Sequence, residues 1–159
     1  MAYHHAMEKR ESKKAETSPM PAIRCDHLFV YGTLMTAAAT AGLGMSERAQ
    51  LHAASCSLGP ATLQGTLYNL GSYPAFVEGG ADHGCVHGEV LEIYASASVF
   101  SWLDAYEGID PANPSASEYA RLLRCARRAN GELIEVWVYV YQHQLDHALI
   151  IADGRWKPI

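Results

Sequence analysis

The sequence predicts a small α+β domain whose strands form a closed or nearly closed β-barrel. The first observation is a pair of apolar stretches, Tyr119–Arg127 and Leu133–Tyr141, that flank Asn130-Gly131, a dipeptide typical of tight β-hairpins. The second is that two further predicted strands each contain an internal glycine, which indicates strong curvature or a closely approaching neighbour. The third is that helical spacing is clearest in a single stretch, Ser98–Glu107.

The part of the chain before this helix supplies three more predicted strands. The first is short and consists of β-forming residues, which is typical of a buried strand. The second contains Gly65, interpreted as a possible bulge, and the third contains Gly88. These strands are Leu28–Tyr31, Thr62–Leu70 and Val86–Tyr94, and between them we expect a short helix at Ser46–Leu51, a turn at Gly71–Pro74 and a loop at Glu78–Asp82.

The helix and the last strand carry the clearest patterns. The helix has apolar side chains at helical spacing, Ser98 as a candidate N-terminal cap and Gly108 where a left-handed residue ends a helix. Leu133–Tyr141 places aliphatic side chains on one face and aromatic ones on the other. We therefore expect both faces of this strand to be buried, with the aromatic face against the core or a pocket.

Length and composition fit one globular domain. The 159 residues are enough for a sizeable core, and we expect a disordered tail at residues 1–22 followed by one domain at 23–159. The net charge of −5 disfavours nucleic acid and anionic membranes as partners, because both are themselves negative. Four scattered cysteines and the lack of an apolar run of about 20 residues predict a cytoplasmic protein.

The apolar strand Leu28–Tyr31 leads directly into a glycine-centred turn at Gly32. Glycine permits backbone conformations that other residues avoid, and it lets another molecule approach the main chain closely. Main-chain N–H groups that leave a strand end without a ladder partner form a small cradle for an anion or a carbonyl. The sequence therefore predicts a site for something small and polar at this turn.

Glu107 stands at the end of the predicted helix, where the helix dipole disfavours a carboxylate. Beside the apolar Leu103 and Tyr106, burial and the dipole are expected to raise its pKa, as a general base for an amine requires. The alternative is a solvated acid on a surface turn. Asp104, one turn earlier, is interpreted as a local hydrogen-bonding or solvent-facing group.

Other chemistry-bearing groups are weaker candidates. His83, Cys85 and His87 lie close together in the sequence, and His143 and His147 are four residues apart, but neither set has the spacing of a familiar metal site. A nucleophilic Cys85 beside His87 lacks a recognisable orienting partner. Arg121 and Arg124 are expected to be solvated, with Glu118 a possible partner of Arg121; the other residues of these sets are interpreted as loop, strand-edge or surface groups.

Six segments, taken in order and spacing, resemble the gamma-glutamylcyclotransferase-like family, which includes plant avirulence-induced-gene proteins and gamma-glutamylamine cyclotransferases. A closing segment, Asp153–Trp156, is also similar, and the resemblance covers about residues 26–156. The six segments are Tyr31-Gly32-Thr33-Leu34, Leu67–Pro74, Val86–Val90, Leu103–Gly108, Glu118–Arg121 and Val136–Tyr139.

The resemblance implies a small mixed β-barrel with flanking helices and a cyclotransferase that acts on gamma-glutamyl amines or peptides, releasing 5-oxoproline and an amine. No metal or organic cofactor is expected, and the partner is a small-molecule substrate. By position, the family's acid/base falls on Glu107, and the expected substrate-binding residues are Tyr31, Gly32, Thr33, Leu34, Tyr119 and Tyr139. The alternatives are a non-catalytic small-molecule-binding or interaction module on the same fold, or a different amide-processing reaction.

Overall fold

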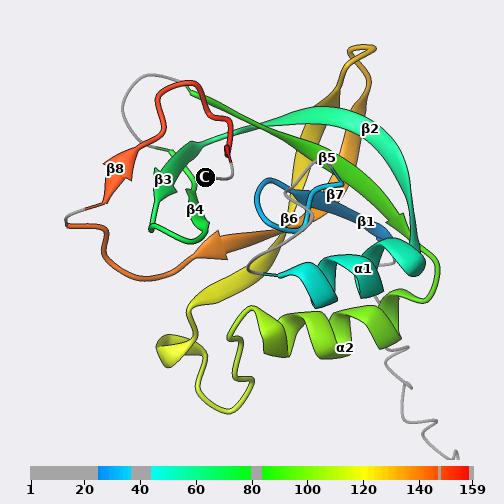
Figure 1. Ribbon diagram of the computed structural model, residues 1–159, viewed down its shortest axis with the longest axis horizontal. Helices are drawn as coiled ribbons and strands as arrows, with labels where there is room; N and C mark the ends of the chain where they lie inside the picture. Colours follow the sequence, from blue (N-terminus) through cyan, green and yellow to red (C-terminus); the bar gives the residue numbers. More distant parts are fainter. Residues whose placement is uncertain (1–24, 37–43, 80–83, 147, 158–159) are drawn as a thin grey trace, which may run out of the picture.

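A computed structural model describes residues 25–36, 44–79, 84–146 and 148–157; the tail expected at residues 1–22 lies outside these ranges. Within them the chain forms eight strands, two α-helices and one short 3-10 helix (Figure 1). In chain order these are β1 (His27–Val30), α1 (Met45–Ala53), β2 (Ser55–Gln64), β3 (Thr66–Asn69), β4 (Pro74–Val77), β5 (Cys85–Ile93), α2 (Ser96–Tyr106), η1 (Pro114–Ala116), β6 (Tyr119–Arg128), β7 (Leu133–Tyr141) and β8 (Leu149–Ile150).

Five of the strands close into a barrel in the order β1-β5-β2-β6-β7. Neighbouring strands are antiparallel except at the closure, where β1 pairs with β7 in parallel through Leu28 and Trp137. The predicted α+β class and the closed mixed barrel are thereby confirmed. The hairpin at Asn130-Gly131 is confirmed too, with Gly131 in the left-handed region at φ 85°.

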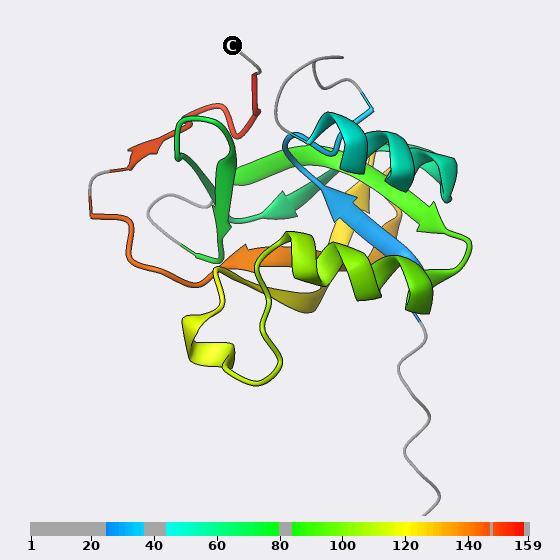
Figure 2. The same ribbon diagram turned by 60° about the horizontal axis from the view of Figure 1, so that its bottom comes forward.

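The two faces of the barrel wall bury two separate clusters. The interior holds side chains such as Phe29, Val90 and Val138. The outer cluster includes Leu28, Leu91, Leu51 of α1, and Phe100 and Leu103 of α2. Both helices therefore pack against the same side of the barrel, with β1 running between them in Figure 2. Strand β7 contributes to both clusters, as its two apolar faces predicted.

A second sheet, β4-β3-β8, lies at one end of the barrel, at the left of Figure 1. The single strand expected at Thr62–Leu70 is wrong: the chain divides at Gly65 into β2, which begins earlier at Ser55, and β3. An ideal Cβ on Gly65 would lie 2.6 Å from the Phe76 ring, so the chain changes sheets where no side chain fits. Pro74, expected in a turn, begins strand β4.

Helix α2 begins at Ser96 with Ala95 as its N-cap, so the expected cap at Ser98 is wrong. Its end agrees with the sequence: Gly108 adopts φ 75°, and its N–H donates to the carbonyl of Ala105 at 3.1 Å. Neither helix in the described ranges combines the length and apolarity needed to span a bilayer.

Candidate active site

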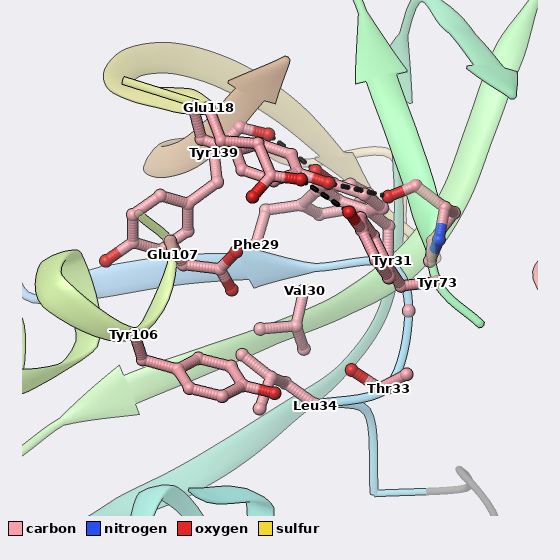
Figure 3. Close-up of a pocket in the computed structure, with 13 residues that line it drawn as sticks. Phe29, Val30, Tyr31, Thr33, Leu34, Tyr73, Tyr106, Glu107, Glu118 and Tyr139 are labelled. Atoms are coloured by element: carbon pink, nitrogen blue, oxygen red, sulfur yellow. Dashed lines mark hydrogen bonds between the residues drawn. The ribbon is translucent and has the colours of Figure 1, made fainter. Parts of the chain in front are cut away.

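A cavity of about 210 Å³ lies where the end of β1 meets the end of α2. Its walls come from segments that are far apart in sequence: the end of β1 and the following turn, the start of β4, the end of α2, the start of β6, and β7 (Figure 3). The lining residues are Phe29, Val30, Tyr31, Gly32, Thr33, Leu34, Tyr73, Pro74, Tyr106, Glu107, Glu118, Tyr119 and Tyr139. All seven residues expected to form the site are among them.

The Glu107 side chain extends into this cavity between Tyr139 and Tyr106 (Figure 3). Glu107 is the C-cap of α2, and its N–H donates to the carbonyl of Leu103 at 2.9 Å. Burial raises the pKa of this carboxyl to about 7, and the negative charges of Glu118 and Asp104 add to the effect. A carboxyl of this kind gains and loses a proton near neutral pH.

The turn after β1 lines the same cavity with Gly32, Thr33 and Leu34. The Met35 N–H donates to the Gly32 carbonyl at 3.1 Å, and the guanidinium of Arg48 donates to the Thr33 carbonyl at 2.8 Å. In contrast, the N–H groups of Gly32, Thr33 and Leu34 donate no hydrogen bond within the described part of the chain. Two fixed carbonyls, with three N–H groups that have no acceptor among the described residues, are the arrangement expected of an anion or carbonyl cradle.

The reason for glycine at position 32 differs from the one expected. Gly32 is not among the residues with left-handed φ values, so the turn needs no special backbone conformation there. An ideal Cβ would instead lie 2.8 Å from Cγ of Pro74, because the proline ring packs directly on the turn. Glycine is required here by a close neighbour from β4.

Three tyrosines line the cavity with hydroxyl groups that are already engaged. Tyr31 donates to the carbonyl of Tyr139 at 2.6 Å, Tyr119 to the carbonyl of Pro74 at 3.0 Å, and Tyr139 to Asp104 Oδ1 at 2.7 Å. Burial is the largest cause of a raised pKa in all three, so they remain neutral at physiological pH. Their hydrogen bonds therefore hold the walls of the cavity together.

Asp104 and Arg121 form an ion pair behind this wall. Arg121 donates to Asp104 through Nε at 2.9 Å and Nη2 at 3.2 Å. Its guanidinium also lies 4.1 Å from the ring centroid of Phe100 and 4.4 Å from that of Trp137, within the range of cation–π attraction. The expectation that Arg121 is solvated or paired with Glu118 is wrong, because strand register places it opposite Tyr139, which shares Asp104 as its partner.

The family model of gamma-glutamyl cyclotransferase, AIG2-like, matches residues 28–158, which include every residue of this cavity. The chain belongs to this family. The gamma-glutamylcyclotransferase family protein YtfP of Escherichia coli strain K12 is 36% identical over 90 residues, covering 57% of this chain and 66% of YtfP. The chain thus spans just under two thirds of the length of the curated relatives it matches.

Solved structures of related proteins share the fold. The solution structure of E. coli YtfP has a TM-score of 0.54 and 30% identity, covering 82% of this chain and 95% of that one. The crystal structure of an AIG2-like protein from Mus musculus has a TM-score of 0.55 and 21% identity, covering 76% and 80% of the two chains. At 21% identity this likeness shows the gamma-glutamylcyclotransferase-like fold alone.

The cavity of this family member also contains residues that sequence reasoning missed: Tyr73, Pro74, Tyr106 and Glu118. Tyr73 and Glu118 are bonded to each other, since the Tyr73 hydroxyl donates to Glu118 Oε1 at 2.5 Å. This bond raises the pKa of Tyr73 to about 12. The one available signal was position: Glu118 stands immediately before a predicted strand, as Glu107 stands at the end of the helix, so the two acids bracket one loop.

The histidine and cysteine groups noted in the sequence form no metal or nucleophile site among the described residues. His83 and His147 lie outside the described residues. Among the residues that are described, no three His, Cys, Asp or Glu side chains lie close enough together to hold a metal ion. Cys85 is exposed and lies outside the set of cavity-lining residues.

Proposed function

We propose that the protein is a cyclotransferase that acts on gamma-glutamyl amines or peptides and releases 5-oxoproline and an amine. The observation that carries the proposal is the meeting of two features in one cavity. One is a carboxyl group with a pKa of about 7, and the other is a turn with three main-chain N–H groups that donate to no described residue. Family membership supports it. The proposed site residues are Glu107 for catalysis and Tyr31, Gly32, Thr33, Leu34, Tyr119 and Tyr139 for substrate binding.

In the proposed reaction the α-amine of the glutamyl group attacks its own γ-carbonyl carbon. Glu107 first accepts a proton from the α-ammonium, which makes the nitrogen nucleophilic. The new C–N bond closes the five-membered lactam, and the ring nitrogen then gives up a second proton. The bond to the γ-linked nitrogen breaks as Glu107 returns its proton to that nitrogen, and the released amine takes up the second proton to leave as an ammonium. Because nucleophile and carbonyl belong to one molecule, holding the substrate in a folded conformation lowers the barrier by several kcal/mol.

The remaining walls suit the same substrate. N–H groups of Gly32 to Leu34 are suited to hold either the α-carboxylate or the developing oxyanion. A cavity of about 210 Å³ is smaller than the roughly 300–1,000 Å³ of sites for drug-sized ligands, which favours a small metabolite. We also propose a cytoplasmic location, supported by the scattered cysteines, and one catalytic domain at residues 23–159.

The direct test is incubation of the purified protein with a panel of gamma-glutamyl amides and dipeptides, with 5-oxoproline measured by mass spectrometry. We expect 5-oxoproline to form together with one equivalent of the released amine. If panel members bind but no 5-oxoproline forms, the result contradicts the proposed cyclotransferase activity. It then supports the alternative, a non-catalytic binding module on the same fold.

Arg121→Gln provides a test of the electrostatics of the site. Removing the guanidinium leaves Asp104 without its counter-charge, and Asp104 already raises the pKa of Glu107. We therefore expect the acid limb of kcat/KM against pH to move to higher pH, since Glu107 must be deprotonated to act as a base.

The matched control is Arg124→Gln on the same strand, whose partner Glu78 lies outside the cavity. In this variant the acid limb of kcat/KM should lie at the same pH as in the unmodified protein. An equal shift of the limb in both variants contradicts the placement of Asp104 and Arg121 beside the reacting carboxyl.

A further inference from the structure

A second carboxylate, Glu118, lines the cavity beside Glu107. The two acids stand at opposite ends of the loop that joins α2 to β6, and main-chain bonds close this loop at its base. The Glu118 N–H donates to the Gly108 carbonyl at 3.2 Å, and the Gln142 N–H donates to the Glu118 carbonyl at 2.9 Å. Glu118 Oε2 lies 3.5 Å from the ideal Cβ position of Gly108, the residue next to Glu107. The fold therefore holds the second acid beside the first.

One oxygen of Glu118 accepts a hydrogen bond, and the described residues supply no donor for the other. Oε1 accepts the Tyr73 hydroxyl at 2.5 Å, as the dashed line between them in Figure 3 shows. Oε2 accepts no hydrogen bond from the described residues. A carboxylate has acceptor positions on both oxygens, so Glu118 is oriented by Tyr73 while it retains the capacity to bind a donor.

The charges around the cavity indicate which donor fits. The thirteen lining residues include Glu107 and Glu118 and no lysine, arginine or histidine. Two guanidinium groups lie behind the walls: that of Arg121 is paired with Asp104, and that of Arg48 donates to the main-chain carbonyl of Thr33. Such a cavity attracts a positively charged group with several N–H donors. Every substrate in the proposed class carries one, the α-ammonium of its glutamyl group.

We propose that Glu118, oriented by Tyr73, binds the α-ammonium of the substrate through Oε2 and presents it to Glu107. This role rests on the proposed function. It divides the work between two neighbouring carboxylates, because one holds the ammonium by charge while the other accepts its proton. Without Glu118 the glutamyl group still fits the cavity, but its nitrogen is no longer directed at Glu107.

Binding of two probes by calorimetry tests this role without relying on turnover. L-glutamine is a gamma-glutamyl amide with an α-ammonium, and 5-oxoproline is the matching lactam without one. At pH 6, below the pKa of Glu107, that side chain is mostly neutral and contributes little attraction to an ammonium. In Glu118→Gln we expect L-glutamine to bind roughly tenfold more weakly, as for a lost charge-assisted hydrogen bond, and 5-oxoproline to bind within twofold of the unmodified protein.

Two further variants sharpen the result. Glu78→Gln removes one negative charge outside the cavity and should leave both affinities unchanged. Tyr73→Phe removes the bond that orients Glu118 and should weaken L-glutamine alone, which also covers the case of a Glu118→Gln protein that fails to fold.

Equal loss of both probes, or unchanged binding of L-glutamine, overturns the role of Glu118 and leaves the proposed function standing. An unmodified protein that binds neither probe overturns the proposed function and this role with it.

Discussion

Replacement of Glu107 by Gln is expected to lower the turnover of gamma-glutamyl amides about 100-fold or more and to make the protein more stable at alkaline pH. Glutamine keeps the shape of the side chain but neither accepts the proton of the α-ammonium nor returns it to the leaving nitrogen. General acid–base catalysis is worth at least this factor. The measurement is kcat by release of 5-oxoproline at pH 8.

The effect on stability follows from the same pKa. Glu107 titrates near 4.5 when unfolded and near 7 when folded, so between these values the native state binds more protons than the unfolded state. The free energy of unfolding therefore falls as pH rises through this window, by roughly 3 kcal/mol in total. Glutamine removes this partly buried charge, and the melting temperature of Glu107→Gln should exceed that of the unmodified protein at pH 8 but not at pH 4.

The two measurements together separate catalysis from structure. A variant that is inactive because it is damaged should be less stable, whereas this one is expected to be inactive and more stable. Full turnover in Glu107→Gln contradicts the acid/base role. Reduced turnover with a lower melting temperature at pH 8 contradicts the interpretation of Glu107 as a carboxylate whose burial is costly.

The barrel could be predicted from sequence where local patterns carry the information. Leu133–Tyr141 is apolar on both faces, and Asn130-Gly131 fixes the turn before it, so hairpin β6–β7 was recognisable. The start of β2 was not, because Ser55, Cys56 and Ser57 show no apolar alternation and become strand through pairing with β5. Strand β8 has two residues and exists through its pairing with β3. Tertiary contacts determine whether such segments form strands.

The residues of the candidate site also fall into two groups: some could be recognised from the sequence, and others are brought together only by the fold. Glu107 was identifiable because the helix dipole disfavours a carboxylate at the C-terminal end of a helix, above all next to apolar residues. The structure places Glu107 in the cavity with a raised pKa. Glu118 has no unusual position relative to a helix end. It lines the cavity because the hydrogen bond from its N–H to the Gly108 carbonyl brings the two ends of its loop together. Asp104 of α2 and Arg121 of β6 meet because α2 packs against the barrel wall beside Tyr139, the residue opposite Arg121, and no short motif reveals this packing.

The internal glycine of β5 shows how the barrel supports the site, and Gly88→Ala is expected to damage both. An ideal Cβ on Gly88 would lie 2.3 Å from the main-chain oxygen of Val30 and 2.6 Å from the buried ring of Phe29. Because the contact is with backbone, β1 itself must move. We expect a loss of about 3 kcal/mol or more in the free energy of unfolding and a melting temperature lower by roughly 10 °C.

The control for this variant is Gly59→Ala in the neighbouring strand β2. Gly59 has a left-handed φ of 93° but no atom within 4 Å of an added Cβ, so its substitution costs the backbone strain alone, about 1–2 kcal/mol. Because Val30 leads directly into Tyr31 and Gly32, Gly88→Ala should also weaken 5-oxoproline binding, while Gly59→Ala should not. Equal destabilisation by the two variants contradicts the close contact between β5 and β1, whereas a larger loss confined to Gly88→Ala ties the substrate-binding turn to the packing of the barrel wall beneath it.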